Sequence, residues 1–166
     1  KLDVSTIKFG RIHGDDDGGL LKDDSTFVPL KISSYISSIK IVTSRQLQSL
    51  QFFYSVDGDK ISAGISSFTK NSINANHNST IFNLTQLGPN ERINRVHLYI
   101  RPSPTSFKIG HRICGIQFYT PNHASPLYGQ KYGQLSIEEY PGFVLAYLRT
   151  GEQDPIRRIQ FVWYKS

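Results

Sequence analysis

Short apolar runs with a two-residue period, each closed by turn residues, recur along this chain and constrain its fold more than any other feature. In the last run, Ile159, Phe161 and Trp163 alternate with residues of the opposite strand face. Such alternation is typical of a β-strand, because successive side chains point to opposite faces of a sheet. No stretch carries a sustained helical period with capping residues. The sequence therefore predicts an all-β protein.

The runs divide the chain into roughly ten to twelve short strands with turn-rich gaps, a pattern typical of a barrel, sandwich or prism. We expect Asp57-Gly58 to form a hairpin turn and residues 71–80, which are polar and rich in Asn, to form an exposed loop. No internal repeat or domain linker is visible, so the 166 residues are interpreted as one domain, 1–166. The clearest runs are 4–12, 27–32, 38–42, 47–54, 95–101 and 112–120, followed by a C-terminal hairpin with arms 142–149 and 156–164.

The chain contains no Met and one cysteine, Cys114. A chain without Met does not begin at a translation start, so we interpret it as a processed product or part of a longer protein. No apolar run reaches the length that crosses a bilayer, and no transmembrane segment is expected. Cys114 lies in an apolar strand and is interpreted as a buried structural thiol.

The charge is distributed unevenly along the chain. The net charge is +6, with acids concentrated early at residues 15–17, 23 and 24 and bases later. No pattern of a nucleic-acid-binding module is present, so no nucleic acid is expected as a partner. The bases are interpreted as a solvated face, and a patch for sulfated glycans or anionic lipid, formed by Arg101, Lys108, Arg112 and Arg157, stays open as an alternative.

Motifs of catalysis and of metal or cofactor binding are missing. The five histidines are scattered, and no nucleophile elbow, phosphate loop or dinucleotide fingerprint occurs. Residues 15–19, Asp-Asp-Asp-Gly-Gly, lack the ligand spacing of an EF-hand and are interpreted as a solvated acidic turn. We expect a protein that is not an enzyme and that needs no metal and no cofactor.

The loop of the C-terminal hairpin, residues 150–155, is polar and contains Gly151 and Asp154. Gly151 can let a ligand approach the backbone, and the carboxylate of Asp154 can accept hydrogen bonds from hydroxyl groups. The same residues are also ordinary turn formers. Taken alone, this loop is better explained as a turn.

Two N-glycosylation sequons begin at Asn78 and Asn83. They favour a secreted or extracellular protein, because that modification occurs on the secretory route. A cytoplasmic location stays open, because such tripeptides also arise by chance in sequence rich in Asn, Ser and Thr.

Several segments, taken in order, resemble the jacalin-related lectin domain over most of the chain. Each segment alone is weak evidence, and their joint order is more specific. They are Ile7-Lys-Phe-Gly10, Gly18-Gly19 with the acidic pair Asp23-Asp24, Leu50-Gln-Phe-Phe-Tyr54, Asn90-Glu91-Arg-Ile93, Ile113-Cys-Gly-Ile-Gln-Phe-Tyr119 with Tyr128-Gly129, and the hairpin Gly142-Phe-Val-Leu-Ala-Tyr147 with Asp154-Pro-Ile156.

The resemblance implies a β-prism I fold, in which three four-stranded Greek-key sheets surround a pseudo-threefold axis. It implies sugar binding where the glycine-rich first loop meets the loop of the last hairpin. The implied partners are glycans or glycoproteins, together with other domains of a parent protein; the sequence leaves homo-oligomer formation open. The implied sugar-binding residues are Gly18, Gly19, Gly151, Glu152, Gln153 and Asp154.

The last loop departs from the family pattern in two ways. The family has Gly-x-x-x-Asp where this chain has Gly151-x-x-Asp154, one residue shorter, and Glu152 and Gln153 stand where an aromatic or basic residue is usual. If the two loops meet, their acids form a negative site that accepts neutral sugars, amino sugars or a cation and repels sulfated ligands.

The sequence therefore predicts a carbohydrate-binding lectin module for neutral sugars of the mannose/glucose or galactose type. One alternative is a sugar-inactive β-prism that acts as a targeting or protein-interaction module. The other is binding of a polyanion or anionic lipid through the basic strands.

Overall fold

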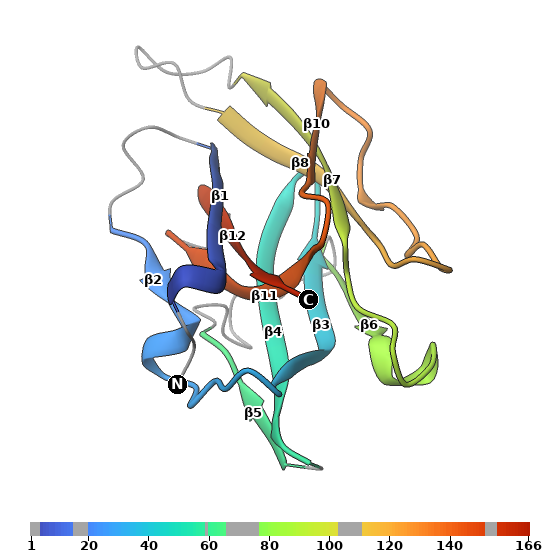
Figure 1. Ribbon diagram of the computed structural model, residues 1–166. Coiled ribbons are helices and arrows are strands. Elements are labelled where there is room, and N and C mark those ends of the chain that lie inside the picture. Colours follow the sequence, from blue (N-terminus) through green and yellow to red (C-terminus); the bar gives the residue numbers. More distant parts are fainter. Residues whose placement is uncertain (1–3, 15–19, 59, 66–76, 103–110, 152–155) are drawn as a thin grey trace.

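The computed structural model describes residues 4–14, 20–58, 60–65, 77–102, 111–151 and 156–166, and these form three four-stranded antiparallel sheets (Figure 1). The first sheet has the order β1-β12-β11-β2, the second β5-β4-β3-β6 and the third β10-β7-β8-β9. The predicted all-β fold with three four-stranded sheets is confirmed. Within these ranges, no helix has the length and apolarity needed to cross a membrane.

The first sheet contains β1 (Ile7–Gly14), β2 (Lys22–Asp23), β11 (Phe143–Thr150) and β12 (Arg158–Lys165). The second contains β3 (Tyr35–Thr43), β4 (Leu47–Asp57), β5 (Lys60–Ala63) and β6 (Asn78–Asn83). The third contains β7 (Arg95–Pro102), β8 (His111–Tyr119), β9 (Tyr128–Gly129) and β10 (Gln134–Glu139). The described part of the chain also contains the short 3₁₀ helices η1 (Val4–Thr6), η2 (Asp24–Thr26) and η4 (Leu84–Gln86), which precede or follow strands.

The same connectivity is repeated in all three sheets. In the second and third sheets, three consecutive strands are followed by a fourth that returns beside the first, which is the Greek key. In the first sheet this order is interrupted, because β1 and β12 lie at opposite ends of the sequence and pair through Ile7 and Tyr164. The pseudo-threefold arrangement thus lies in strand order, and no sequence repeat accompanies it.

The inward faces of the three sheets meet in one apolar core. Its largest fully buried side chains include Trp163 and Phe161 of the first sheet, Phe52 and Tyr54 of the second, and Phe118 of the third. Phe118 stacks on Phe82 with ring planes 8° apart and meets the edge of Phe52. These aromatic contacts join the second sheet to the third.

Two of the expected segments differ from the structure. Residues 27–32 form no strand: Phe27 is 71% exposed and the chain turns there toward β3. Residues 78–80, expected in an exposed loop, instead begin β6, which pairs with β3 from Thr43 to Ser38. The pattern of β6 is weak because it is an edge strand and most of its side chains are exposed.

Candidate functional site

The hairpin of β11 and β12 is central in the first sheet, and β1 and β2 flank it. Gly14, the last residue of β1, pairs with Arg158, while Lys22, the first residue of β2, pairs with Thr150. The first loop therefore leaves and re-enters the sheet at the same end as the hairpin loop, on either side of it (Figure 1). We call this end, defined by Gly14, Lys22, Thr150 and Arg158, the hairpin end.

Of the six sequence-predicted sugar-binding residues, Gly151 is the one that the structure describes. It is buried, and its N–H donates a hydrogen bond of 3.0 Å to the carbonyl oxygen of Arg158. This bond continues the ladder of β11 and β12 to the start of the loop. Gly18, Gly19, Glu152, Gln153 and Asp154 lie outside the described residues, as do the three acids at 15–17.

Gly14 adopts a backbone conformation with φ of +112°. A Cβ at this position would overlap the carbonyl oxygen of Arg157. L-residues rarely adopt such a φ, so glycine is required here for two reasons. The first loop thus begins in close contact with the base of the hairpin loop.

Ile156 fixes the far side of the hairpin loop. Its N–H donates to the carbonyl oxygen of Leu47 at 3.2 Å, and its side chain is buried at 3% exposure. Leu47 begins β4 of the second sheet, so this contact ties the loop to a neighbouring sheet. Both ends of the loop therefore start from fixed positions.

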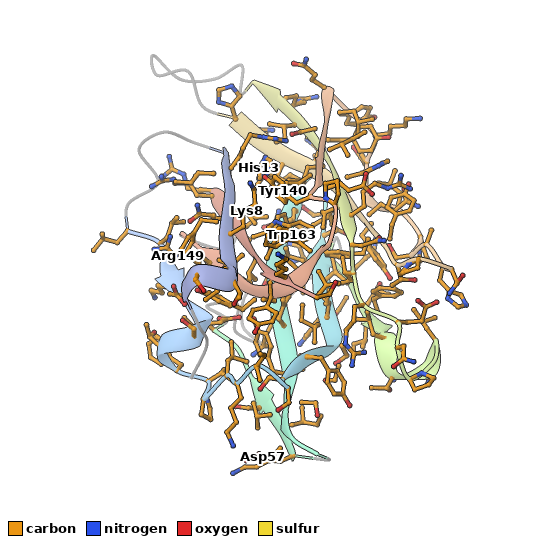
Figure 2. All side chains as sticks on the ribbon, in the orientation of Figure 1. Lys8, His13, Asp57, Tyr140, Arg149 and Trp163 are labelled. Carbon is orange, nitrogen blue, oxygen red and sulfur yellow. The ribbon has the colours of Figure 1, made fainter. Side chains whose placement is uncertain are left out.

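A polar chain crosses the first sheet beside the hairpin end. The Arg149 guanidinium, labelled in Figure 2, lies 3.1 Å from a carboxylate oxygen of Asp23. It donates to Oε1 of Gln160 at 2.5 Å. The amide of Gln160 in turn donates to the carbonyl oxygen of Gly10 at 2.8 Å. These bonds connect all four strands of the sheet and hold the short β2 in register.

Behind β1, a buried carboxylate joins the first sheet to the third. Glu138 of β10 lies 2.5 Å from the imidazole of His13 and accepts hydrogen bonds from the indole of Trp163 at 2.9 Å and the hydroxyl of Tyr140 at 3.2 Å. Figure 2 labels three of these side chains near β1 and β12. A Cβ on Gly10 would overlap the carboxylate, so Gly10 makes room for it.

The two carboxylates of the acidic pair Asp23-Asp24 have different surroundings and different partners. Asp24 is 2% exposed; it accepts a hydrogen bond from Tyr54 at 2.5 Å and another from the N–H of Ile65 at 2.8 Å. Burial raises the pKa of Asp24 to about 6. Its role is therefore to join the first and second sheets, and its neighbour Asp23 alone stands beside the hairpin end.

Leu20 is a candidate contact that sequence reasoning missed. It is 94% exposed and lies two residues before β2. The signal was present in the apolar pair Leu20-Leu21, which directly follows the two predicted glycines. Leu20 supplies exposed apolar surface next to Lys22 at the hairpin end.

The thiol of Cys114 is buried, and the possible metal ligands do not cluster within the described residues. Cys114 is 1% exposed, and burial raises the pKa of its thiol. This confirms the prediction of a buried thiol. Across the described ranges, His, Cys, Asp and Glu form no group of three that could hold a metal ion.

The structure brings together two of the four bases proposed for a basic patch. Arg101 and Arg112 are direct cross-strand partners in β7 and β8. They point outward, because the next pair, Ile100 and Ile113, includes a fully buried side chain. Arg157 belongs to the hairpin of the first sheet instead, and Lys108 lies outside the described residues.

Comparison with protein families assigns most of the chain to one domain type. The model of the Jacalin-like lectin domain matches residues 10–161. The search of curated proteins gives no match. The family is one of lectins, so the match agrees with the prediction of a binding protein rather than an enzyme.

Solved structures of lectins share the fold at low sequence identity. Artocarpin in complex with mannotriose superposes with a TM-score of 0.74 at 17% identity, covering 95% of this chain and 97% of that chain. A mannose-specific jacalin-related lectin from Morus nigra, in complex with mannose, gives 0.74 at 16% identity, covering 99% and 98%. A mannose-binding jacalin-related lectin from Ananas comosus gives 0.73 at 13% identity, covering 96% and 99%. With this β-prism fold and a family match that spans residues 10–161, the chain belongs to the Jacalin-like lectin domain family.

Proposed function

We propose that the chain is a lectin module that binds neutral sugars of the mannose type at the hairpin end. The observation that carries the proposal is the register of the first sheet, which sets Gly14 and Lys22 on either side of the hairpin where Thr150 and Arg158 flank its loop. The solved neighbours named above include mannose and mannotriose complexes. In this proposal Gly18, Gly19, Gly151 and Asp154 hold sugar hydroxyls, with Glu152 and Gln153 beside them.

The acids of the two loops and the exposed side chain of Leu20 indicate which ligand to expect. The acids of the two loops favour neutral hydroxylated ligands over phosphorylated or sulfated ones. Exposed Leu20 offers an apolar contact of the kind that packs against the C–H face of a pyranose. One shallow site of this type gives weak monovalent binding, so function relies on multivalent display.

The test is calorimetric titration with methyl α-mannoside, together with a glycan array, on wild type and Asp154→Ala. We expect mannose binding by wild type and its loss in the variant, because the carboxylate accepts hydrogen bonds from sugar hydroxyls. Asp57→Ala is the matched control, since Asp57 is an exposed carboxylate at the tip of β4, remote from Arg149 in Figure 2. Unchanged binding by Asp154→Ala would refute this site.

An array without any sugar hit would favour the alternative of a sugar-inactive β-prism that targets or binds other proteins. The one-residue-shorter loop between Gly151 and Asp154 motivates that alternative. The two outcomes differ in the effect of free mannose. Capture of a protein partner that persists in excess mannose supports the interaction module, whereas capture that mannose abolishes supports the lectin.

A second candidate function is polyanion binding on the outer face of the third sheet. Arg101 and Arg112 lie opposite each other on that face, although like charges in this position destabilise a strand pair. Arg101 also lies 5.8 Å from the ring centroid of the exposed Tyr132, and Lys131 lies 5.9 Å from that of Tyr99. Two adjacent guanidiniums beside aromatic rings suit a sulfated polysaccharide.

Heparin chromatography at rising salt tests this candidate. We expect wild type to be retained and the double variant Arg101→Gln/Arg112→Gln to elute earlier, because counterion release makes such binding depend on the number of cations involved. Lys22→Gln/Lys60→Gln removes the same net charge from exposed lysines in other sheets. If both double variants elute together, retention reflects total charge and the proposed face is wrong.

For location, we propose a secreted or extracellular protein. Asn78 supports this, because it is exposed on the edge strand β6 and can carry a glycan without entering the core.

A further inference from the structure

A cavity of about 650 Å³ lies between β11 and β12 of the first sheet and the segment that leads into β3, away from the hairpin end. Val144 and Ala146 of β11 contribute to its floor, and Leu30 comes from the segment that leads to β3. Val144 pairs with Tyr164, six residues before Thr150, so the cavity lies about 20 Å along the strand from the hairpin end. It is therefore separate from the proposed sugar site.

The lining combines apolar and aromatic side chains with the hydroxyl groups of Thr6, Ser33, Ser34 and Ser166. Val144, Ala146 and Leu30 are half-buried, and Tyr35 and Tyr164 add aromatic walls. Ile32, at 68% exposure, extends the apolar surface toward solvent. A volume of this size and a lining of this kind are typical of sites that bind small molecules.

The charged side chains in the lining all have the same sign. Arg92, Lys31 and Lys165 line the cavity, and none of the described lining side chains is acidic. The guanidinium carbon of Arg92 lies 4.1 Å from the ring centroid of Tyr35, and its Nη1 donates to the carbonyl oxygens of Glu91 at 3.1 Å and Pro89 at 3.4 Å. Lys31 is already paired with Asp57 at 2.9 Å, whereas no carboxylate among the described residues forms a salt bridge with Arg92 or Lys165.

We propose that this cavity binds an amphipathic monoanion, with its apolar body against Val144 and Ala146 and its acidic head near Arg92 and Lys165. The apolar walls favour a hydrocarbon or aromatic body because burial removes its surface from water. A cationic guanidinium at a partly buried site favours a carboxylate or sulfonate over a neutral head group. A long-chain carboxylate combines both features.

The test uses 1-anilinonaphthalene-8-sulfonate, an aromatic sulfonate that fluoresces in apolar surroundings, and displaces it with dodecanoate. We expect saturable binding to the native protein at one site, displacement by dodecanoate, and at least about tenfold weaker displacement by dodecanol, which has the same chain without the charge. Arg92→Gln should weaken dodecanoate binding by about tenfold and leave dodecanol unchanged.

Ala146→Trp fills the cavity and should abolish probe binding, whereas Ala63→Trp, on the exposed strand β5, adds the same side chain elsewhere and should not. Mannose titration and thermal unfolding of the same variants show whether each is folded. If Ala146→Trp unfolds, the affinities of Arg92→Gln for dodecanoate and dodecanol test the proposal instead. The proposal is overturned by an absence of saturable binding, by equal displacement with dodecanol, or by unchanged dodecanoate affinity in Arg92→Gln.

Discussion

Nε2 of His13 and a carboxylate oxygen of Glu138 lie 2.5 Å apart although the two residues are 125 positions apart in sequence. His13 is on β1 of the first sheet and Glu138 on β10 of the third, and both are almost completely buried. Because Trp163 and Tyr140 donate to Glu138, one carboxylate contacts buried groups of β1 and β12 and the partly buried Tyr140 between β10 and β11. The pair therefore fixes how the two sheets meet.

Replacing Glu138 by Ala should destabilise the protein by about 3–5 kcal/mol, because the indole N–H of Trp163 and the imidazole of His13 would lose their partner in the core. Glu138→Gln keeps an acceptor and should cost less, about 1–2 kcal/mol. Urea unfolding measures both losses.

Glu139→Ala is the matched control, since this neighbouring carboxylate is exposed on the opposite face of β10. It should change the free energy of unfolding by less than about 0.5 kcal/mol. A loss as small as this in Glu138→Ala would contradict a structural role for the buried carboxylate.

Asp24 should make stability depend on pH between about 4 and 6. Burial raises its pKa from 3.8 to about 6, so the folded state binds a proton that the unfolded state has already released. The free energy of unfolding therefore falls as pH rises through this window, by at most about 3 kcal/mol, and then levels off above it.

Asp24→Asn removes this titration while retaining an oxygen that can accept from the N–H of Ile65. Unfolding in urea at pH 4 and pH 6.5 should show wild type losing more stability than the variant. In Asp57→Asn the wild-type slope should persist, because Lys31 lowers the pKa of Asp57 and its titration lies below the window. Equal slopes in wild type and Asp24→Asn would argue against the raised pKa.

Of the two sequons, the one at Asn78 should carry the glycan when the chain is expressed through a secretory route. Asn78 is exposed, whereas the side-chain oxygen of Asn83 accepts from the N–H and hydroxyl of Thr85 and caps η4. Peptide N-glycosidase digestion followed by mass measurement detects the modification. Asn78→Gln should abolish the mass shift and Asn83→Gln should keep it; the reverse result would exclude Asn78.

The sequence predicted strands where a long run alternates between core and outside, whereas it predicted an exposed loop at residues 78–80, where the edge strand β6 begins. β7 shows the alternation best, because Val96 and Leu98 are fully buried and alternate with outward residues. The prediction also failed for β2, since two residues carry no period and β2 exists through its pairing with β11 at Arg149 and Thr150. In β12 the side chains of both faces are buried: Gln160 and Val162 are as inaccessible as Ile159, Phe161 and Trp163, which the alternation in the sequence does not reveal.

For the candidate site, the sequence predicted which loops belong together but not how they are held. The N–H of Gly151 donates a hydrogen bond to the carbonyl oxygen of Arg158. A hydrogen bond between backbone groups does not depend on the side chains, so the sequence pattern does not predict it. The same holds for Ile156 and its bond to Leu47 across two sheets. The roles of Glu138 and Asp24 depend on partners far away in sequence, so composition gives only their charge.

Gly14→Ala should both destabilise the first sheet and weaken sugar binding. The new Cβ would overlap the carbonyl oxygen of Arg157, and φ of +112° is unfavourable for any L-residue, so we expect a loss of about 2–4 kcal/mol in the free energy of unfolding. Because Arg157 leads out of the hairpin loop, relief of the overlap would move the base of the proposed site, and mannose affinity should fall at least about tenfold in calorimetry.

Gly142→Ala separates the cost of the positive φ from the cost of the overlap with Arg157. Gly142 has φ of +82° in the turn that precedes β11, but beyond its chain neighbours no atom lies within 4 Å of its added Cβ. This variant should therefore show the backbone cost alone, about 1 kcal/mol, with mannose affinity unchanged. If Gly14→Ala lost no more stability than Gly142→Ala and bound mannose as wild type does, the contact between Gly14 and Arg157 would not position the hairpin end, and the proposed site would have to be supported by the loop residues alone.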